Sequence, residues 1–171
     1  IFTVAGALEE GIIKPTDSFN CEGNLKFNDG VNNWTINCVN RNGHGYLDIT
    51  GGITQSCNVV MMNIALLEGQ ETFTKYQQIF GFGDYTDIDL PAEAQGLVYD
   101  AESMGRTDLA TNSFGQNYTC SMIQMAAAYC SIVNGGNYYQ PHVVKQILNA
   151  EGAVAENIEP VLVRETVSQS T

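Results

Sequence analysis

Residues Gln55–Leu67 read QSCNVVMMNIALL, a short polar turn followed by a long apolar run. The run from Val59 to Leu67 has the length and composition of a core helix, and Asn63 is its only polar residue. It is much shorter than the roughly 20 apolar residues that a membrane-spanning helix needs. We therefore expect a buried helix over 59–69 that begins immediately after the turn.

Helices are expected to dominate the rest of the chain. Apolar residues recur at helical spacing from Ile1, and Gly11 ends that segment. Asp48 is a suitable N-cap for a short helix before the turn, and Ser121 with Gln124 forms a capping box for a later one. The expected helices cover residues 1–10, 48–55, 59–69, 71–80 and 121–134. The last is expected to turn inward Ile123, Ala126, Ala127, Cys130 and Val133.

Two β-hairpins are expected beside the helices. The first covers Phe19–Val39 around the turn signal Asn28-Asp29-Gly30. The second covers Tyr138–Val163, where short alternating runs are separated by Glu151-Gly152. The stretch Asp84–Thr111 contains scattered Gly and Pro and is expected to be a loop.

The composition excludes several classes of function. With 171 residues, 44% of them hydrophobic, the chain is long enough for one domain with a real core, or for two small ones. It has 19 acidic and 7 basic residues, a formal charge of −12. Nucleic-acid and anionic-lipid binding both need clustered Lys and Arg, so neither is expected. Both ends have the pattern of a sequence that is cut within an element, which predicts an internal fragment of a larger protein.

The cysteines give no metal-binding pattern. None of the five forms a Cys-x-x-Cys pair, and only two histidines are present, so the sequence predicts neither a metal site nor a cofactor. Cys21 and Cys38 lie on the two arms of the first expected hairpin, which predicts Cα atoms within disulfide reach, roughly 4.4–6.8 Å. The cysteines expected to be buried and unpaired are Cys57, Cys120 and Cys130.

The turn Ser56-Cys57-Asn58 allows several interpretations. On its own, the commonest role of Ser56 or Asn58 here is to cap a helix by satisfying its first amides. Cys57 with His44 could in principle form a thiol nucleophile and its base, but an inert buried cysteine is more common. His44 stands between two glycines and is more simply interpreted as a loop residue that forms hydrogen bonds.

A succession of short segments along the chain favours a functional role for the Ser56-Cys57-Asn58 turn. In their order and spacing they resemble the transpeptidase domain of penicillin-binding proteins, of the class B type that cross-links peptidoglycan. The resemblance covers essentially the whole chain, and it implies an α+β fold: a mostly helical subdomain of the serine β-lactamase/transpeptidase-like fold, with the central sheet largely missing. The segments are Ile1–Gly11, Gly43-His44-Gly45, Ser56-Cys57-Asn58, Phe80–Gly83, Ile88–Glu93, Ser113–Gln116, Gln124–Tyr129 and Asn134-Gly135-Gly136.

The family has three signature motifs, Ser-x-x-Lys, Ser-x-Asn and Lys-Thr-Gly. Ser56-Cys57-Asn58 matches the second, and the other two are absent from this sequence. The resemblance therefore implies that residues 1–171 are a fragment of a single transpeptidase domain, between the two absent motifs. The fragment by itself is expected to be inactive.

The resemblance also implies roles for individual residues. Ser56 would relay a proton to the leaving nitrogen, and Asn58 would hold the substrate amide and the catalytic Lys of the family. Phe114, Gly115 and Gln116 would support the site. The implied partners are peptidoglycan stem peptides and β-lactams. The implied location is the extracytoplasmic face of the bacterial membrane, with the parent protein membrane-anchored.

Other functions stay open at this point. A class A β-lactamase would need a Glu-x-x-Leu-Asn loop, and no Glu here begins that pattern, so fast hydrolysis is disfavoured. A β-lactam sensor or a catalytically dead penicillin-binding module would need a similar pocket without turnover. Because the helices would lack their sheet, an apolar face is expected to be exposed or covered by self-association.

Overall fold

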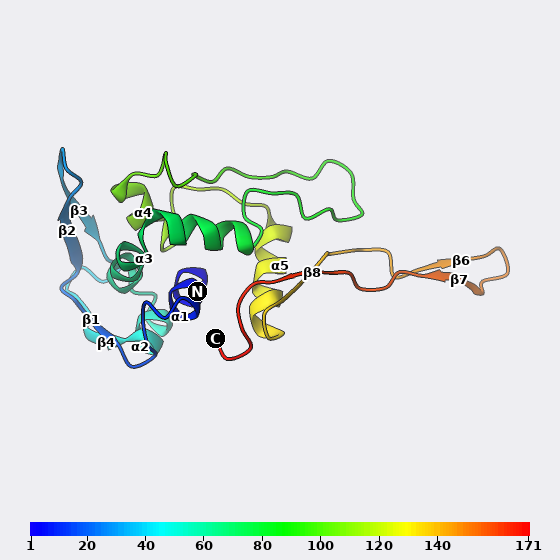
Figure 1. The fold of residues 1–171 in the computed structure, drawn as a ribbon, viewed down its shortest axis with the longest axis horizontal. Helices are drawn as coiled ribbons and strands as arrows, with labels where there is room; N and C mark the ends of the chain where they lie inside the picture. Colours follow the sequence, from blue (N-terminus) through cyan, green and yellow to red (C-terminus); the bar gives the residue numbers. More distant parts are fainter. The chain divides into compact units, whose positions relative to one another are not determined.

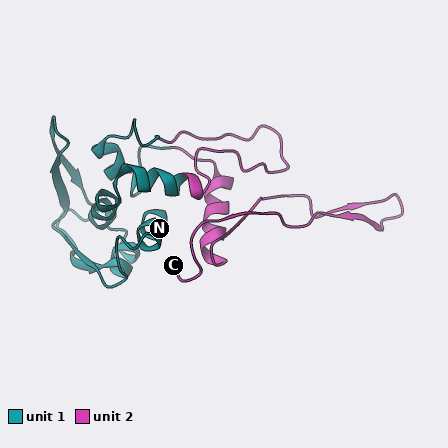
Figure 2. Ribbon diagram, in the orientation of Figure 1, with its two compact units in different colours: residues 1–77, 99–118, 171 teal, residues 78–98, 119–170 magenta.

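The computed structural model describes all 171 residues, which form two compact units (Figure 2). Unit 1 comprises residues 1–77, 99–118 and 171, and unit 2 comprises residues 78–98 and 119–170. The helices are α1 (Phe2–Glu9), α2 (Ile49–Thr54), α3 (Asn58–Ile79), α4 (Arg106–Asn112) and α5 (Met122–Val133). The strands are β1 (Ser18–Cys21), β2 (Asn24–Asn28), β3 (Asn33–Asn37), β4 (Gly45–Asp48), β5 (Asn137–Tyr139), β6 (Gln146–Leu148), β7 (Val154–Asn157) and β8 (Leu162–Glu165).

The expected helices are confirmed, and local chemistry explains their ends. The Asp48 side chain accepts a hydrogen bond from the Gly51 amide at 2.7 Å and so caps α2. Ser121 and Gln124 form the expected capping box of α5. The two helices expected over 59–69 and 71–80 are the two parts of α3, which is interrupted at Gly69, where φ is +75°.

The expected loop over 84–111 is wrong in its last part, because α4 begins at Arg106. This helix has only seven residues and buries Leu109, Ala110 and Asn112. The Asp108 carboxylate accepts a hydrogen bond from the Gly105 amide at 3.0 Å, which stabilises the first turn. The N-cap residue Gly105 has no side chain, so the sequence gives no capping signal for this helix. The apolar pattern is also too short to indicate a helix.

The strands form four two-stranded antiparallel ribbons, β1–β4, β2–β3, β5–β8 and β6–β7. The first expected hairpin is correct only between Asn24 and Asn37, because β1 leaves it and pairs with β4. Gly23 separates β1 from β2 at φ +88°, where a Cβ atom would lie 2.1 Å from the Arg41 carbonyl oxygen. Cys21 and Cys38 are therefore on different ribbons, and both thiols are free.

The core of unit 1 forms around the first half of α3. Val60, Met62 and Ile64 are fully buried there, and α1 contributes Val4 and Ala7 to the same cluster. Half-buried apolar side chains from β1, β2 and β3 pack against this cluster. They are Phe19, Leu25, Phe27 and Ile36. The ribbons of unit 1 therefore lie on a hydrophobic core rather than standing alone.

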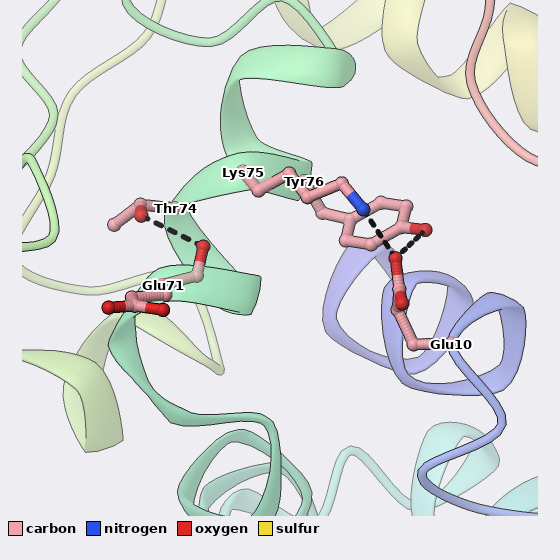
Figure 3. A network of polar contacts seen from close by, with 5 residues as sticks. All are labelled: Glu10, Glu71, Thr74, Lys75 and Tyr76. Atoms are coloured by element: carbon pink, nitrogen blue, oxygen red, sulfur yellow. Dashed lines mark hydrogen bonds and ion pairs between the residues drawn. The ribbon is translucent and has the colours of Figure 1, made fainter.

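The second half of α3 holds the end of α1 by a polar contact (Figure 3). Lys75 Nζ forms an ion pair with Glu10 Oε1 at 2.5 Å, and the Tyr76 hydroxyl donates to the same oxygen at 2.9 Å. These two hydrogen bonds lower the pKa of the Glu10 carboxyl. Gly6 allows this close approach, since a Cβ atom on it would lie 2.8 Å from Tyr76 Cγ and 3.0 Å from Glu68 Oε1.

Unit 2 is built on α5, whose inward face differs from the expected one. Its buried residues are Gln124, Ala127, Ala128 and Ser131, so the helix is rotated by about one residue from the expected face. The expected burial of Cys120 and Cys130 is therefore wrong: Cys130 is exposed, and Cys120 is partly exposed in the segment before the helix. Gln124 Nε2 donates to the carbonyl oxygens of Asp84 and Gln95, at 2.5 and 2.7 Å. Gln124 and Ser131 are thus buried polar side chains with internal hydrogen-bond partners. Hydrophobic spacing alone could not indicate that they lie on the inward face of α5.

The second expected hairpin is confirmed as a long two-part ribbon, in which β5 pairs with β8 and β6 pairs with β7 (Figure 1). Gly152 has φ +78° at the turn between β6 and β7. Every residue of β6 and β7 is exposed. Exposed apolar side chains gather along this ribbon, including Val143, Val144, Ile147, Leu148, Val154, Val161, Leu162 and Val163. None of the helices has the length and apolar character required to cross a membrane.

Candidate functional site

Ser56 occupies a strained turn between α2 and α3. Its φ is +50°, the left-handed region, which costs a non-glycine residue roughly 1–3 kcal/mol. The backbone is held there by two hydrogen bonds, from the Ser56 amide to the Ile53 carbonyl (3.0 Å) and from the Cys57 amide to the Gly52 carbonyl (2.9 Å). The Ser56 side chain is exposed. The surrounding structure therefore maintains a strained backbone that presents a hydroxyl group to solvent.

Asn58 begins α3 and is half-buried. Its Nδ2 donates to the Asn37 carbonyl oxygen at 3.3 Å, which links the start of α3 to the end of β3. Neither Ser56 nor Asn58 accepts a side-chain hydrogen bond from the first amides of α3, so the interpretation of this turn as a helix cap is not supported. The hydroxyl and the carboxamide flank one fully buried residue, Cys57.

The thiol of Cys57 points into the core rather than toward solvent. Burial raises the pKa of this thiol to about 12, and the side chain has no exposed surface. A thiolate nucleophile must be reachable and must ionise readily. The interpretation of Cys57 as a nucleophile with His44 as its base is therefore excluded.

The same part of the core brings together four side chains that no motif in the sequence groups. The sulfur atoms of Cys21 and Cys38 each lie 3.6 Å from His44 Nδ1, and Cys38 Sγ lies 3.8 Å from Cys57 Sγ. All four ligand atoms are within 4.8 Å of one another. Spacing along the chain did not indicate this group, because the residues are separated in sequence and only the fold gathers them.

The segment that follows α4 contains the three expected supporting residues. Phe114 is half-buried and packs against the core cluster that also contains Cys57 and Val59. Gly115 and Gln116 are exposed, and their amides close a turn onto the carbonyl oxygens of Asn112 and Thr111, each at 3.0 Å. A direct role for these residues in the site stays a prediction.

The family model of the penicillin binding protein transpeptidase domain matches residues 1–171. The stage V sporulation protein D of Bacillus subtilis is 32% identical over 173 residues, which cover 100% of this chain and 26% of that protein. The chain thus spans about a quarter of the length of the curated relatives it matches.

Solved structures match the fold of this chain over nearly its whole length. A peptidoglycan synthetase from Bifidobacterium adolescentis superposes with a TM-score of 0.87 at 25% identity, over 99% of this chain and 30% of that one. Penicillin-binding protein 3 of Mycobacterium tuberculosis, complexed with aztreonam, gives a TM-score of 0.84 at 24% identity, over 99% of this chain and 37% of that one. The arrangement of helices and short ribbons is therefore that of part of a serine transpeptidase fold.

Proposed function

The chain belongs to the penicillin-binding protein transpeptidase family, and we propose that it supplies the Ser-x-Asn motif of a peptidoglycan D,D-transpeptidase. In this proposal residues 1–171 are part of one transpeptidase domain. The nucleophilic serine, its lysine and the Lys-Thr-Gly motif come from other parts of the complete protein. The reaction is serine acyl transfer between two peptidoglycan stem peptides.

The state of Ser56 is the observation that carries the proposal. The hydroxyl is exposed, it caps no helix, and a left-handed backbone holds it next to Asn58. Non-glycine residues in this conformation persist where the surrounding structure requires them, which is common at active sites. A structural serine would more simply be buried or would cap α3.

The chemistry assigns a distinct task to each polar group. When the nucleophilic serine attacks the substrate amide, its proton passes to the base, and the departing amine must gain a proton. Ser56 relays that proton through its hydroxyl, which can donate and accept simultaneously. Asn58 holds the substrate amide carbonyl by its Nδ2 and accepts from the catalytic lysine by its Oδ1.

The substrate and location follow from the same proposal. Peptidoglycan stem peptides are the acyl donor and acceptor, and β-lactams are the mimics that trap the serine. One curated relative is a peptidoglycan D,D-transpeptidase, and one solved relative is a complex with aztreonam. In this proposal the site works at the extracytoplasmic face of the membrane. Self-association through exposed apolar surface remains a prediction.

The test compares three forms of the complete transpeptidase, with fluorescent penicillin as the acylating probe. Ser56→Ala is expected to slow acylation by roughly 10²–10⁴, the range for a lost proton-transfer group. Gln55→Ala is the matched control, because this exposed neighbour lies in the same turn and should leave the rate unchanged. Equal rates in the two variants, with unchanged thermal unfolding, would exclude Ser56 from the reaction.

The 171-residue chain alone provides a second arm of this test. It is expected to show no covalent label, because none of its lysines belongs to a Ser-x-x-Lys motif. A strong band from this chain would place the nucleophile within it and overturn the assignment. If the complete protein is acylated but fails to cross-link stem peptides, the function is that of a β-lactam sensor instead.

A further inference from the structure

The β2–β3 ribbon of unit 1 has two outer edges, and one of them begins beside the proposed site (Figure 1). Asn37, the last residue of β3, accepts a hydrogen bond from Asn58 Nδ2 through its main-chain carbonyl. This carbonyl therefore points out of the ribbon toward the start of α3. We propose that the free edge of β3 (Asn33–Asn37) binds the acyl-acceptor stem peptide as an added β-strand. The inference rests on the proposed function and concerns a segment outside the three signature motifs of the family.

The register of the ribbon shows which main-chain groups are free. In an antiparallel pair, residues that exchange hydrogen bonds with their partner alternate with residues whose N–H and C=O groups point outward. The Cys38 amide donates to the Gly23 carbonyl at 2.9 Å, so the Lys26–Thr35 pair three residues along points outward. The N–H and C=O of Thr35 thus lie on the same edge as the Asn37 carbonyl. Thr35 is exposed, and its main chain forms no hydrogen bond outside the ribbon.

The β3 edge lacks the features that normally prevent the addition of a strand. Exposed edges are usually protected by charged side chains, proline or a β-bulge. The sequence of β3 is NWTIN, without a charge or a proline, and its register with β2 is regular over all five residues. Both ribbons of unit 2 contain a register shift, and the opposite edge of this ribbon carries Lys26. Of the β2–β3 ribbon, only the β3 edge is therefore open to another strand.

The position of the edge selects the acceptor peptide as its occupant. In the second half of the reaction, the acceptor amine attacks the acyl-serine ester. The new C–N bond forms, the C–O bond to the serine breaks, the amine loses a proton and the serine oxygen gains one. Because Ser56 relays the amine proton in the proposed function, the incoming amine must lie at its hydroxyl group. The rest of the acceptor needs a surface next to Ser56 and Asn58, and the β3 edge begins there.

Strand addition explains how an extended peptide binds without a deep pocket. Main-chain hydrogen bonds to a sheet edge supply the affinity in this mode of recognition. A second copy of the chain is the competing occupant. Symmetric pairing of two β3 edges would have only the outward groups of Asn33 and Thr35 to use, because Asn58 already occupies the Asn37 carbonyl. So short a contact falls well below the ~1,200 Å² of a stable interface, whereas a substrate needs only transient binding.

The test uses the complete transpeptidase, a soluble stem-peptide ester as acyl donor, and a synthetic stem peptide with a free amine as acceptor. Thr35→Pro removes an outward N–H, which the β2–β3 pairing does not use. It should raise the KM for the acceptor about tenfold. The loss should be confined to this step, since acylation by fluorescent penicillin needs no acceptor. Lys26→Pro is the matched control, because it makes the same change directly opposite, on the other edge.

The two proposals fail in different ways. An unchanged acceptor KM in Thr35→Pro, with normal acylation by penicillin, would overturn the acceptor site and leave the proposed function in place. An equal rise in Thr35→Pro and Lys26→Pro would also overturn it, because the effect would then come from the ribbon as a whole. If the unmutated complete protein is not acylated by penicillin, the proposed function itself fails.

A second measurement needs no variant and so does not depend on whether a proline is tolerated. In the unmutated protein without a donor, a saturating concentration of the acceptor stem peptide should slow hydrogen exchange at the Thr35 amide. The Lys26 amide on the opposite edge should exchange as before. Unchanged exchange at Thr35 would overturn the proposal. Protection of Thr35 that appears without peptide and grows with protein concentration would assign the edge to a second copy instead.

Discussion

The two units hold their β-ribbons in opposite ways. In unit 1, half-buried side chains of β1, β2 and β3 pack on the α3 core, and both ribbons end near buried cysteines. In unit 2, the β6–β7 ribbon is exposed along its whole length, and the segment just before β6 is anchored by hydrogen bonds from the Val143 and Val144 amides to the Asp89 carboxylate. The same secondary structure therefore depends on tertiary packing in one unit and on short hydrogen-bonded contacts in the other.

The largest difference is expected between apolar residues of the two regions. Met62→Ala removes a side chain with no exposed surface from the unit 1 core and should lower the free energy of unfolding by about 2–5 kcal/mol. Ile147→Ala removes a side chain of β6 that is 46% exposed and should change it by no more than about 0.5 kcal/mol. Urea unfolding followed by circular dichroism measures both. Similar losses would mean that the two units depend on packing equally.

A buried carboxyl makes the stability of unit 1 depend on pH. Neither carboxylate oxygen of Glu68 has a hydrogen-bond partner, and burial raises its pKa to about 8 from an ordinary 4.5. Below pH 4.5 the group is protonated in both states. Between 4.5 and 8 only the unfolded chain releases the proton, so stability falls as pH rises.

Substitution of Glu68 should therefore remove this pH dependence. At pH 7 the folded chain keeps a proton that the unfolded chain releases, which lowers the free energy of unfolding by about 3 kcal/mol. Glu68→Gln should therefore lack the decline in stability between pH 4.5 and 8. Glu71→Gln is the matched control, since this glutamate of α3 is exposed. Urea unfolding at a series of pH values gives the result. The same decline in Glu68→Gln and in the unmutated chain would show that Glu68 ionises normally.

A smaller effect is expected at the start of α5, the helix of unit 2. Ser121→Ala removes the oxygen that accepts from the Gln124 amide and should cost about 1 kcal/mol in the free energy of unfolding. Met122→Ala at the next, exposed position should have almost no effect. Thermal unfolding of the two variants distinguishes them. Equal stability would mean that packing alone sets the start of this helix.

The smallest effect is expected at the anchor of the unit 2 ribbon. The Asp89 carboxylate accepts hydrogen bonds from the amides of Val143 and Val144, at 2.7 and 2.9 Å, and these amides lower its pKa. The anchor is present above the ordinary pKa of the carboxyl and is lost as pH falls through the lowered value. Asp89→Asn should speed hydrogen exchange at these two amides without changing the core of unit 1, and Glu151→Gln at the β6–β7 turn should leave them unchanged.

Local signals in the sequence were sufficient for most helices and for the second hairpin. Asp48 and Ser121 act within three residues of the helices that they cap, and Gly69 and Gly152 need only their own backbone conformation. The Ser-x-Asn motif was equally visible, because it is three consecutive residues. Features decided by neighbours in sequence can be predicted from sequence.

Most helices, the turns, the family and the motif at Ser56 could thus be established before any coordinates were known. Three features could not: the pairing of β1 with β4, the burial of Gln124 rather than Cys130 on α5, and the meeting of Cys21, Cys38, His44 and Cys57. Each of them depends on closing a loop, and the interactions that compensate for that loss of entropy come from distant partners. Periodicity and spacing describe one segment at a time, whereas pairing and convergence are properties of several segments packed together.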